Sequence, residues 1–196
     1  MSSLVPKLIY GIGLNSGKYP AKVNGKNTHI YNLWRNVLAR CYDPNYHREK
    51  PTYVGCSVSG NFQNYSYFYE WAQQQIGFGQ ENYHLDKDLI LRGNRVYSED
   101  TCVFLPWELN GLLLSRKSAR GTLPIGVSDH RGRFRACCSG SSRLYHIGIF
   151  DTVEEAFLAY KQAKESYIKL QAEKWKALID PRAFAALMAY EVSITD

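Results

Sequence analysis

The spacing of hydrophobic residues in the first half of this chain predicts helices. From Thr28 to Cys41 apolar side chains recur every three or four positions, which is the period of an amphipathic helix. A second helix is predicted to begin near Asn61, a residue type suited to the N-cap position. Its buried face is expected to consist of the apolar residues at helical spacing, which are Phe62, Tyr65, Tyr69, Ala72 and Ile76.

Two stretches of the first half show neither a helical nor a strand period. Residues 1–26 are rich in Gly, Asn, Lys and Pro, and we expect them to form an irregular arm. A polar loop containing Pro44 and Pro51 is predicted to follow the first helix, before a short strand around residues 53–58.

From residue 83 onward the pattern changes to that of short strands. Residues 83–90 predict one strand, residues 91–94 a turn, and residues 102–105 a second strand. Pro106 then occupies a position at which a helix can begin, because its fixed φ suits a first helical turn. The segment is therefore predicted to run in the order strand, turn, strand, helix.

The next segment predicts three strands and a well-marked helix. Short apolar stretches between residues 125 and 150 have the character of strands. Thr152 and Glu155 form a capping box that begins a helix. The apolar stripe of this helix is Ala156, Phe157, Tyr160, Ala163, Tyr167 and Leu170. A last helix is predicted to begin at Asp180 and Pro181, which combine an N-cap residue with a first-turn proline.

Positive charge is concentrated on the three predicted strands and the residues before them. The chain has 24 Lys and Arg against 18 Asp and Glu, a net charge of +6. Residues 111–150 hold one acidic residue, Asp129, and seven basic ones, so their net charge is also +6. The basic residues are Arg116, Lys117, Arg120, Arg131, Arg133, Arg135 and Arg143. Such an excess attracts a polyanion, since each neutralised phosphate releases counterions, and nucleic acid is the expected partner.

Composition limits the environment in which the chain works. No apolar run approaches the roughly 20 residues of a membrane span, and no signal peptide is recognisable, so we expect a cytoplasmic protein without membrane association. The five cysteines include no C-x-x-C pair, and adjacent Cys137 and Cys138 would point to opposite faces of a strand. We therefore expect reduced thiols and no structural zinc site.

Residues 28–115 resemble the HNH endonuclease family in the form common in bacteriophages. The resemblance rests on four groups of residues in the predicted strands and helix: Leu85-Asp86-Lys87-Asp88, Gly93-Asn94, Cys102-Val103-Phe104 and Asn110. In that family two strands and a helix hold one divalent metal beside the scissile phosphate. Oxygen ligands suit Mg²⁺ (or Mn²⁺), which polarises the phosphate and stabilises the leaving oxygen.

The resemblance implies roles for individual residues. Asp86 matches the metal ligand on the first strand, and Asn110 matches the ligand on the helix. Lys87 occupies the position of the family's general base, and Thr101 that of the asparagine that orients this base. An exposed lysine is protonated at pH 7 and cannot accept a proton. Asp88 and His84 are the substitute bases, and strand alternation would place them on one face with Asp86.

Residues 121–170 resemble the APETALA-type (ethylene-response-factor-like) DNA-binding domain. The matching residues are Gly126-Val127, Phe134-Arg135-Ala136, Gly148-Ile149-Phe150-Asp151-Thr152, Glu154-Glu155-Ala156 and Ala159-Tyr160. In that family a three-stranded sheet lies in the major groove and the helix packs behind it. The chain departs from the family at Ser128-Asp129-His130, where an arginine is usual, and at His146, where a tryptophan is usual.

Strand alternation assigns the two faces of this predicted sheet. Arg133 and Arg135 share one face, while Phe134 and Ala136 share the face toward the helix. The residues expected to meet DNA are Arg131, Arg133, Arg135, Arg143 and Tyr145.

These observations predict an α+β protein made of an HNH-like ββα-metal unit with preceding helices, a three-stranded antiparallel sheet packed on one helix, and a C-terminal helix. The expected parts are an arm (1–26), the HNH-like domain (27–115), the APETALA-type domain (116–170) and a helical extension (171–196).

Three functions are consistent with the sequence. The first is a homing-type endonuclease that cuts double-stranded DNA with one Mg²⁺ or Mn²⁺ per active site. The second is a catalytically lapsed scaffold that acts as a DNA-binding regulator or as an inhibitor of a host protein. The third is an RNA-binding module, because a basic aromatic sheet can also stack single-stranded bases. We expect a monomer or homodimer without a small-molecule cofactor, in the host cytoplasm if phage-encoded.

Overall fold

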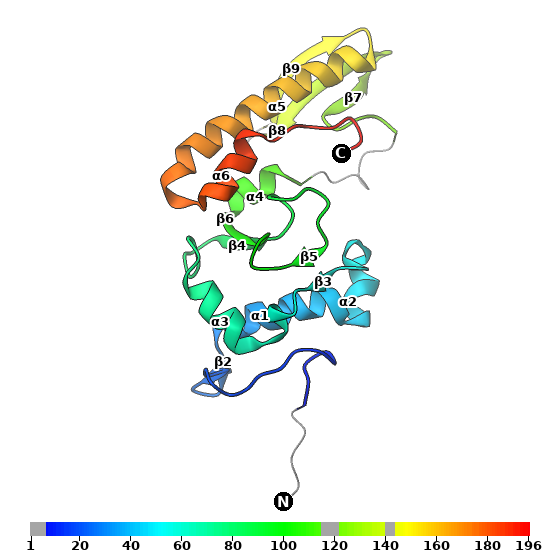
Figure 1. Cartoon of the computed structure of the whole chain (residues 1–196). Coiled ribbons are helices and arrows are strands. Elements are labelled where there is room, and N and C mark those ends of the chain that lie inside the picture. The colour runs from blue at the N-terminus through cyan, green and yellow to red at the C-terminus, as the bar shows by residue number, and fades with distance from the viewer. Residues whose placement is uncertain (1–6, 115–121, 140–143) are drawn as a thin grey trace, which may run out of the picture. The chain divides into compact units, whose positions relative to one another are not determined.

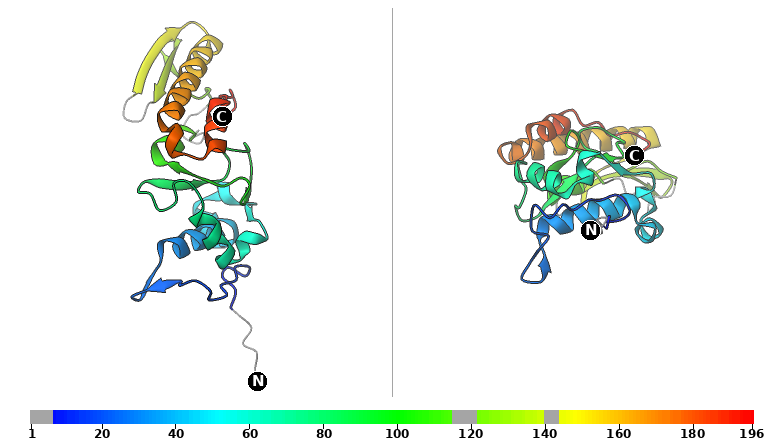
Figure 2. Two further views of the ribbon diagram at one scale, coloured as in Figure 1. Left: turned by 60° about the vertical axis from the view of Figure 1, so that its left-hand side comes forward. Right: turned by 60° about the horizontal axis from the view of Figure 1, so that its bottom comes forward.

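The computed structural model describes residues 7–114, 122–139 and 144–196. Its helices and small sheets are drawn in Figure 1, and in two further views in Figure 2. The mixture of separate helices with two- and three-stranded sheets confirms the predicted α+β class. No helix in the described ranges is long and apolar enough to cross a lipid bilayer.

The chain forms two compact units. Unit 1 comprises Met1–Gln80 and Leu85–Phe104, and unit 2 comprises Glu81–His84 and Leu105–Asp196. The predicted boundary between residues 115 and 116 lies outside the described residues. The division between the two compact units passes through two short strands, β4 (Tyr83–Asp86) and β6 (Val103–Pro106), which pair as a two-stranded sheet.

Unit 1 is built on two of the predicted helices. Helix α1 (His29–Tyr42) begins where the sequence predicts it, since the Thr28 hydroxyl accepts a hydrogen bond from the Tyr31 N–H at 3.3 Å. Its Trp34 is completely buried and donates its indole N–H to the Phe62 carbonyl at 2.7 Å. The aromatic rings of Phe62 and Phe68 pack edge to face with centroids 5.0 Å apart. The core of unit 1 therefore contains a cluster of packed aromatic side chains.

The second predicted helix begins later and ends earlier than its hydrophobic pattern indicates. Residues Asn61–Gln63 form a 3₁₀ turn, and helix α3 (Tyr65–Gln73) is capped by Asn64, whose side chain accepts from the Ser66 N–H at 2.9 Å. Because the helix stops at Gln73, Ile76 lies beyond it and is 46% exposed. The prediction that Ile76 is buried is wrong.

The loop predicted around Pro44 contains a helix. Asp43 accepts a hydrogen bond from the Asn45 N–H at 2.9 Å, and helix α2 (Pro44–Glu49) follows with proline in its first turn. The 3₁₀ turn Pro51–Tyr53 then leads to strand β3 (Ser57–Val58), which pairs in parallel with β5 (Val96–Tyr97). The same Asp-Pro signal that predicts the last helix of the chain operates here.

The described part of the predicted arm is ordered. Strands β1 (Lys22–Val23) and β2 (Lys26–Asn27) form a hairpin. Asn24 and Gly25 at its tip both have positive φ, as a two-residue hairpin turn requires. The expectation of irregular structure is therefore wrong for these residues, because an Asn-Gly pair specifies a tight turn without any hydrophobic period.

Unit 2 contains the three-stranded sheet predicted from the sequence. Strands β7 (Val127–His130), β8 (Arg133–Ser139) and β9 (Leu144–Phe150) pair antiparallel in that order. Helix α5 (Val153–Trp175) lies along one face of the sheet, as Figure 2 shows. Its N-terminus has the predicted capping box, with reciprocal hydrogen bonds between Thr152 and Glu155 at 3.2 Å.

Two further helices and the C-terminal segment complete unit 2. Helix α4 (Trp107–Leu112) follows β6, and α6 (Pro181–Met188) begins at the predicted Asp180 cap. Beyond α6 the chain returns to α5, where the Glu165 carboxylate accepts from the Val192 N–H at 2.8 Å. Val192 thereby joins the core of the sheet and helix, so the predicted extension (171–196) contributes to the core of the segment predicted as the 116–170 domain.

Candidate nucleic-acid interface and the Asp86 loop

The two faces of the three-stranded sheet differ in chemistry. Phe134, Ala136 and Cys138 of β8 pack into the core formed with α5. Arg133, Arg135 and Cys137 alternate with them and therefore lie on the other face, which we call the outer face. Strand alternation thus assigns both arginines as predicted, because the alternate residues of β8 pack into the core formed with α5.

The pairing of the strands sets the neighbours of each arginine. His130 lies opposite Arg133, and Ser128 lies opposite Arg135 on β7. The Nε of Arg135 donates to the Ser128 hydroxyl at 3.4 Å, a long hydrogen bond within the outer face. On β9, Ile149 lies opposite Arg135 and is 36% exposed. The outer face therefore combines cationic, polar and apolar side chains.

Arg133 has an acidic partner that the count of charges between residues 111 and 150 does not include. Its Nε donates to Oδ1 of Asp151 at 2.7 Å. Both side chains are well exposed, 53% for Arg133 and 78% for Asp151. The ion pair thus offsets part of the positive charge of the outer face.

Arg131 occupies the tip of the β7–β8 hairpin. Arg131 and Gly132 have φ values of 56° and 81°, and the strands pair immediately beyond them at His130 and Arg133. Two successive residues with positive φ form a type I′ turn, which suits the twist of the flanking strands. The turn leaves the Arg131 side chain exposed at the end of the sheet.

An irregularity in β9 changes the face that Tyr145 would occupy. The register shifts between Ala136 and Cys137, which lie opposite Gly148 and His146, so β9 has an extra residue there. As a result His146 falls opposite Cys137 of the outer face, while Tyr145 falls opposite the buried Cys138. Tyr145 is nevertheless 53% exposed. His146 is a residue of the outer face that the sequence did not single out for DNA contact.

Four of the seven basic residues that raise the charge of this region lie outside the described residues. They are Arg116, Lys117, Arg120 and Arg143, the last of which is a predicted DNA contact. The described basic residues are Arg131, Arg133 and Arg135, and the nearby acidic ones are Asp129 and Asp151. On the described sheet these three arginines and two aspartates give only a small net positive charge. The attraction of an anion therefore depends on which face each charged side chain occupies.

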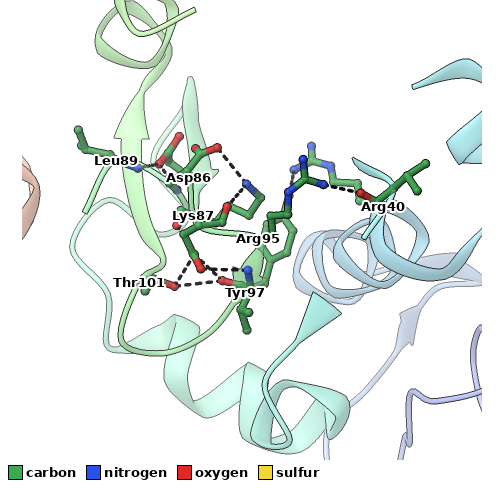
Figure 3. Close-up of polar contacts among 11 residues, drawn as sticks. Arg40, Asp86, Lys87, Leu89, Arg95, Tyr97 and Thr101 are labelled. Carbon is green, nitrogen blue, oxygen red and sulfur yellow. Dashed lines mark hydrogen bonds and ion pairs between the residues drawn. The ribbon is translucent and has the colours of Figure 1, made fainter. Parts of the chain in front are cut away.

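Asp86 ends strand β4 through its side chain. Its Oδ1 accepts hydrogen bonds from the N–H groups of Asp88 at 3.0 Å and Leu89 at 2.8 Å, as Figure 3 shows. An aspartate that bonds the backbone two and three residues ahead turns the chain. The predicted strand 83–90 therefore stops at Asp86, and strand alternation does not extend to Asp88. The expected face shared by His84, Asp86 and Asp88 is wrong for this reason.

Lys87 has firm partners of its own. Its Nζ lies 2.9 Å from Oδ2 of Asp88 and 2.9 Å from the Asn94 carbonyl oxygen, and 5.7 Å from the centre of the Tyr97 ring. The side chain is only 11% exposed. As an ammonium that donates to two oxygens, Lys87 has no lone pair with which to take a proton from water. Its contacts instead connect the end of β4 to the start of β5.

Asn94 holds this loop together. Its amide nitrogen donates to the carbonyl oxygens of Lys87 and Val96, both at 2.7 Å, and its Oδ1 accepts from the Val96 N–H at 3.0 Å. The same nitrogen lies 3.2 Å from the Thr101 hydroxyl, which itself donates to the Val96 carbonyl. Thr101, at the position where the HNH family orients its base, thus supports the loop. The Gly93-Asn94 pair signals a turn in the sequence but not these cross-loop bonds.

The negatively charged form of the Asp86 carboxyl group is disfavoured by its surroundings. Burial, and then the neighbouring Asp88 carboxylate, raise the pKa of Asp86, although the two backbone N–H groups act in the opposite direction. Both hydrogen bonds end on Oδ1, so within the described part of the chain Oδ2 accepts none. A divalent cation would find there a hard oxygen donor of the type it prefers.

The predicted ligand Asn110 and the predicted substitute base His84 belong to the second unit. Asp86, Lys87 and Asp88 belong to unit 1, whereas the exposed His84 and the half-buried Asn110 of α4 belong to unit 2. Among the described residues no three His, Cys, Asp or Glu side chains gather as metal ligands would. All five cysteines are free thiols. No protein-family model matches the chain, and no curated protein or solved structure is significantly similar to it.

Proposed function

We propose that this protein binds double-stranded DNA through the outer face of the β7–β8–β9 sheet. The observation that carries the proposal is that the two faces of the sheet carry different kinds of side chain. One face packs against α5, and the other presents Arg133 and Arg135 in line, with Arg131 at the adjoining hairpin tip. The major groove of B-DNA admits a narrow ribbon of β-strands, and arginine is the side chain that most often contacts guanine there.

The spacing of the two arginines suits duplex DNA. Alternate residues of a strand are about 7 Å apart, which is close to two base-pair steps of about 3.4 Å. A sheet that follows the groove therefore brings successive outward side chains to successive pairs of bases or phosphates. The backbone contacts would fix the position of the sheet, and base contacts would supply sequence preference.

Salt dependence tests the proposal directly. Affinity for a fluorescent duplex is measured by anisotropy over a range of salt for the native chain and for the double variant Arg133→Ala/Arg135→Ala. We expect weaker binding and a slope of log K against log salt that falls by roughly one unit for each lost phosphate contact.

The matched control is Lys174→Ala/Lys176→Ala, which removes the same charge from exposed positions of unit 2 outside the sheet. If the salt slope is unchanged in the arginine variant, or if the lysine control loses as much affinity, the outer face is not the DNA-binding surface. Unlabelled single-stranded RNA as competitor distinguishes the RNA-binding alternative, because it should displace the duplex only weakly.

Metal-dependent DNA cleavage is a second candidate function. What supports it is the Asp86 carboxylate, which is destabilised by burial and by Asp88 and has one oxygen without a hydrogen bond from the described residues. Mg²⁺ or Mn²⁺ bound through Asp86 would supply the charge that polarises a phosphodiester. A regulator without cleavage activity is the alternative.

Nicking of supercoiled plasmid decides between the two. The protein is incubated with plasmid and Mg²⁺ or Mn²⁺, and in parallel with chelator. For an endonuclease, nicking requires metal and is lost in Asp86→Asn and Asn110→Ala. Asp86→Asn is preferable to alanine because its amide oxygen can still accept the two backbone hydrogen bonds that end β4. Intact DNA binding without metal-dependent nicking by the native chain would exclude the endonuclease and leave the regulator.

A further inference from the structure

The Arg133–Asp151 ion pair lies on the surface proposed to meet DNA. Phe134 pairs with Phe150 in the sheet, so the register continued by one residue places Asp151 directly across from Arg133. Their contact at 2.7 Å follows from this register. An exposed pair of this kind contributes at most about 1 kcal/mol to stability. The fold therefore has little need of Asp151 as a partner for Arg133.

The contact uses one particular nitrogen of the guanidinium group. Asp151 accepts from Nε, and within the described residues neither terminal nitrogen of Arg133 has a hydrogen bond. A guanine offers two acceptors, O6 and N7, in the major groove, and arginine binds them with two N–H groups. An arginine held at Nε keeps its two terminal nitrogens free for such a contact and loses little side-chain freedom on binding.

A carboxylate at this position opposes phosphate binding. Asp151 is 78% exposed, and its charge would repel a phosphate that approached Arg133. The same carboxylate can accept a hydrogen bond from the exocyclic amine of cytosine, the partner of guanine in a base pair. The charges of Arg133 and Asp151 thus complement the edge of a G·C pair better than they complement the backbone.

We propose that Asp151 is a positioning residue that directs Arg133 to guanine in the major groove instead of to phosphate. The inference rests on the proposed function and adds to it a sequence preference for guanine at one position of the bound site. According to this inference, Asp151 has opposite effects on the overall affinity for DNA and on the discrimination between bases. The carboxylate lowers affinity for DNA in general and raises discrimination in favour of guanine.

The test uses Asp151→Asn with Asp129→Asn as its matched control. Asp129 is an exposed carboxylate of the β7–β8 hairpin that carries Arg133, but it lies opposite Phe134 on the other face and forms no ion pair within the described part of the chain. Duplexes are selected from a pool with a randomised core by the native chain. Affinity is then measured for the selected duplex and for versions in which each guanine in turn is replaced by adenine. Thermal melting of each variant checks that the fold is retained.

We expect one guanine position at which Asp151→Asn reduces the discrimination against adenine by about tenfold to a hundredfold, the value of one good bidentate contact. Affinity for unselected duplex should rise in the same variant, with a salt slope steeper by up to about one unit, since Arg133 can then turn to phosphate. Asp129→Asn should leave the discrimination unchanged.

Two results would overturn the inference while the proposed function stands. One is salt-dependent duplex binding by the native chain without a guanine preference at any position. The other is a guanine preference that Asp151→Asn retains while affinity for all duplexes rises equally. Failure of the proposed function gives a different pattern, in which Arg133→Ala/Arg135→Ala leaves the salt slope of the native chain unchanged.

Discussion

At the scale of single residues, contacts decide what a motif residue does. Asp86 and Lys87 match positions of a metal ligand and a general base, yet their hydrogen bonds shape the loop between β4 and β5. Arg133 lies on the face that alternation predicts, but its Nε is bonded to Asp151. In each case the residue type is evident from the sequence, whereas its partner is not.

Gly126 shows a residue fixed by two independent constraints. Its φ is +78°, and a Cβ atom built on it would lie 2.1 Å from Cδ2 of Tyr160, a ring buried in the core of the sheet and α5. We expect Gly126→Ala to lower the free energy of unfolding by about 3 kcal/mol, from left-handed strain and overpacking together. Urea denaturation measures the loss.

Gly132 provides the control for this prediction. Its φ is +81°, but a Cβ atom added there would meet no described atom within 4 Å outside the neighbouring residues. Gly132→Ala should therefore cost only the backbone strain, about 1 kcal/mol. Equal losses in the two variants would mean that the contact with Tyr160 is not what requires glycine at position 126.

At the scale of elements, side chains at the ends of helices and strands set boundaries that hydrophobic patterns leave open. Asn64 rather than Asn61 caps α3, and Asp43 begins a helix within a segment predicted as a loop. Asp86 ends β4 four residues before the end of its predicted strand. These bonds act within two or three residues of the chain, so they outweigh a periodicity that is averaged over a longer window.

The end of β4 yields a prediction about stability. Asp86→Ala leaves the Asp88 and Leu89 N–H groups without their acceptor and should cost about 1–2 kcal/mol, as the loss of a capping residue does. Asp86→Asn retains an acceptor oxygen and removes the charge that burial and Asp88 oppose. It should therefore be at least as stable as the native chain at pH 7, and urea denaturation of the three chains compares them.

The pH dependence of stability follows from the same group. Burial and Asp88 raise the pKa of Asp86 in the folded chain, so the folded state holds this proton more tightly than the unfolded state. Stability contributed by the protonated form is lost as pH rises from about 4, the ordinary value for aspartate, through the raised pKa. Urea denaturation across this range should show a decline that Asp86→Asn reduces. An identical decline in the variant would contradict the assignment.

At the scale of the whole molecule, segments far apart in the sequence complete each unit. In unit 2 the residues after α6 close the core of the sheet and α5, with Val192 buried and Tyr190 packed beside it. Lys161 donates to the Val192 carbonyl oxygen at 3.0 Å, and Glu165 accepts from the Val192 N–H. The proposed DNA-binding sheet thus depends on a segment that carries no signal of its own in the sequence.

Removal of this segment tests its role. Truncation after Met188 exposes the core around Ala136 and Tyr160, and it should lower the free energy of unfolding of unit 2 by at least about 2 kcal/mol, the value of burying one valine side chain. Truncation after Val192 retains the buried contact and should have little effect. Thermal melting compares the two, and equal losses would show that the last residues, not Val192, matter.

Patterns in the amino-acid sequence alone predict the α+β class, the helix from Thr28, the three-stranded sheet with its capped helix α5, and the outward position of Arg133 and Arg135. These features depend on local periodicity and capping. Both can be recognised in a single sequence because they involve residues only a few positions apart. The Arg133–Asp151 pair and the closure of the core by Val192 follow from the tertiary structure alone. They arise from strand register and from packing between distant segments, which no local pattern specifies.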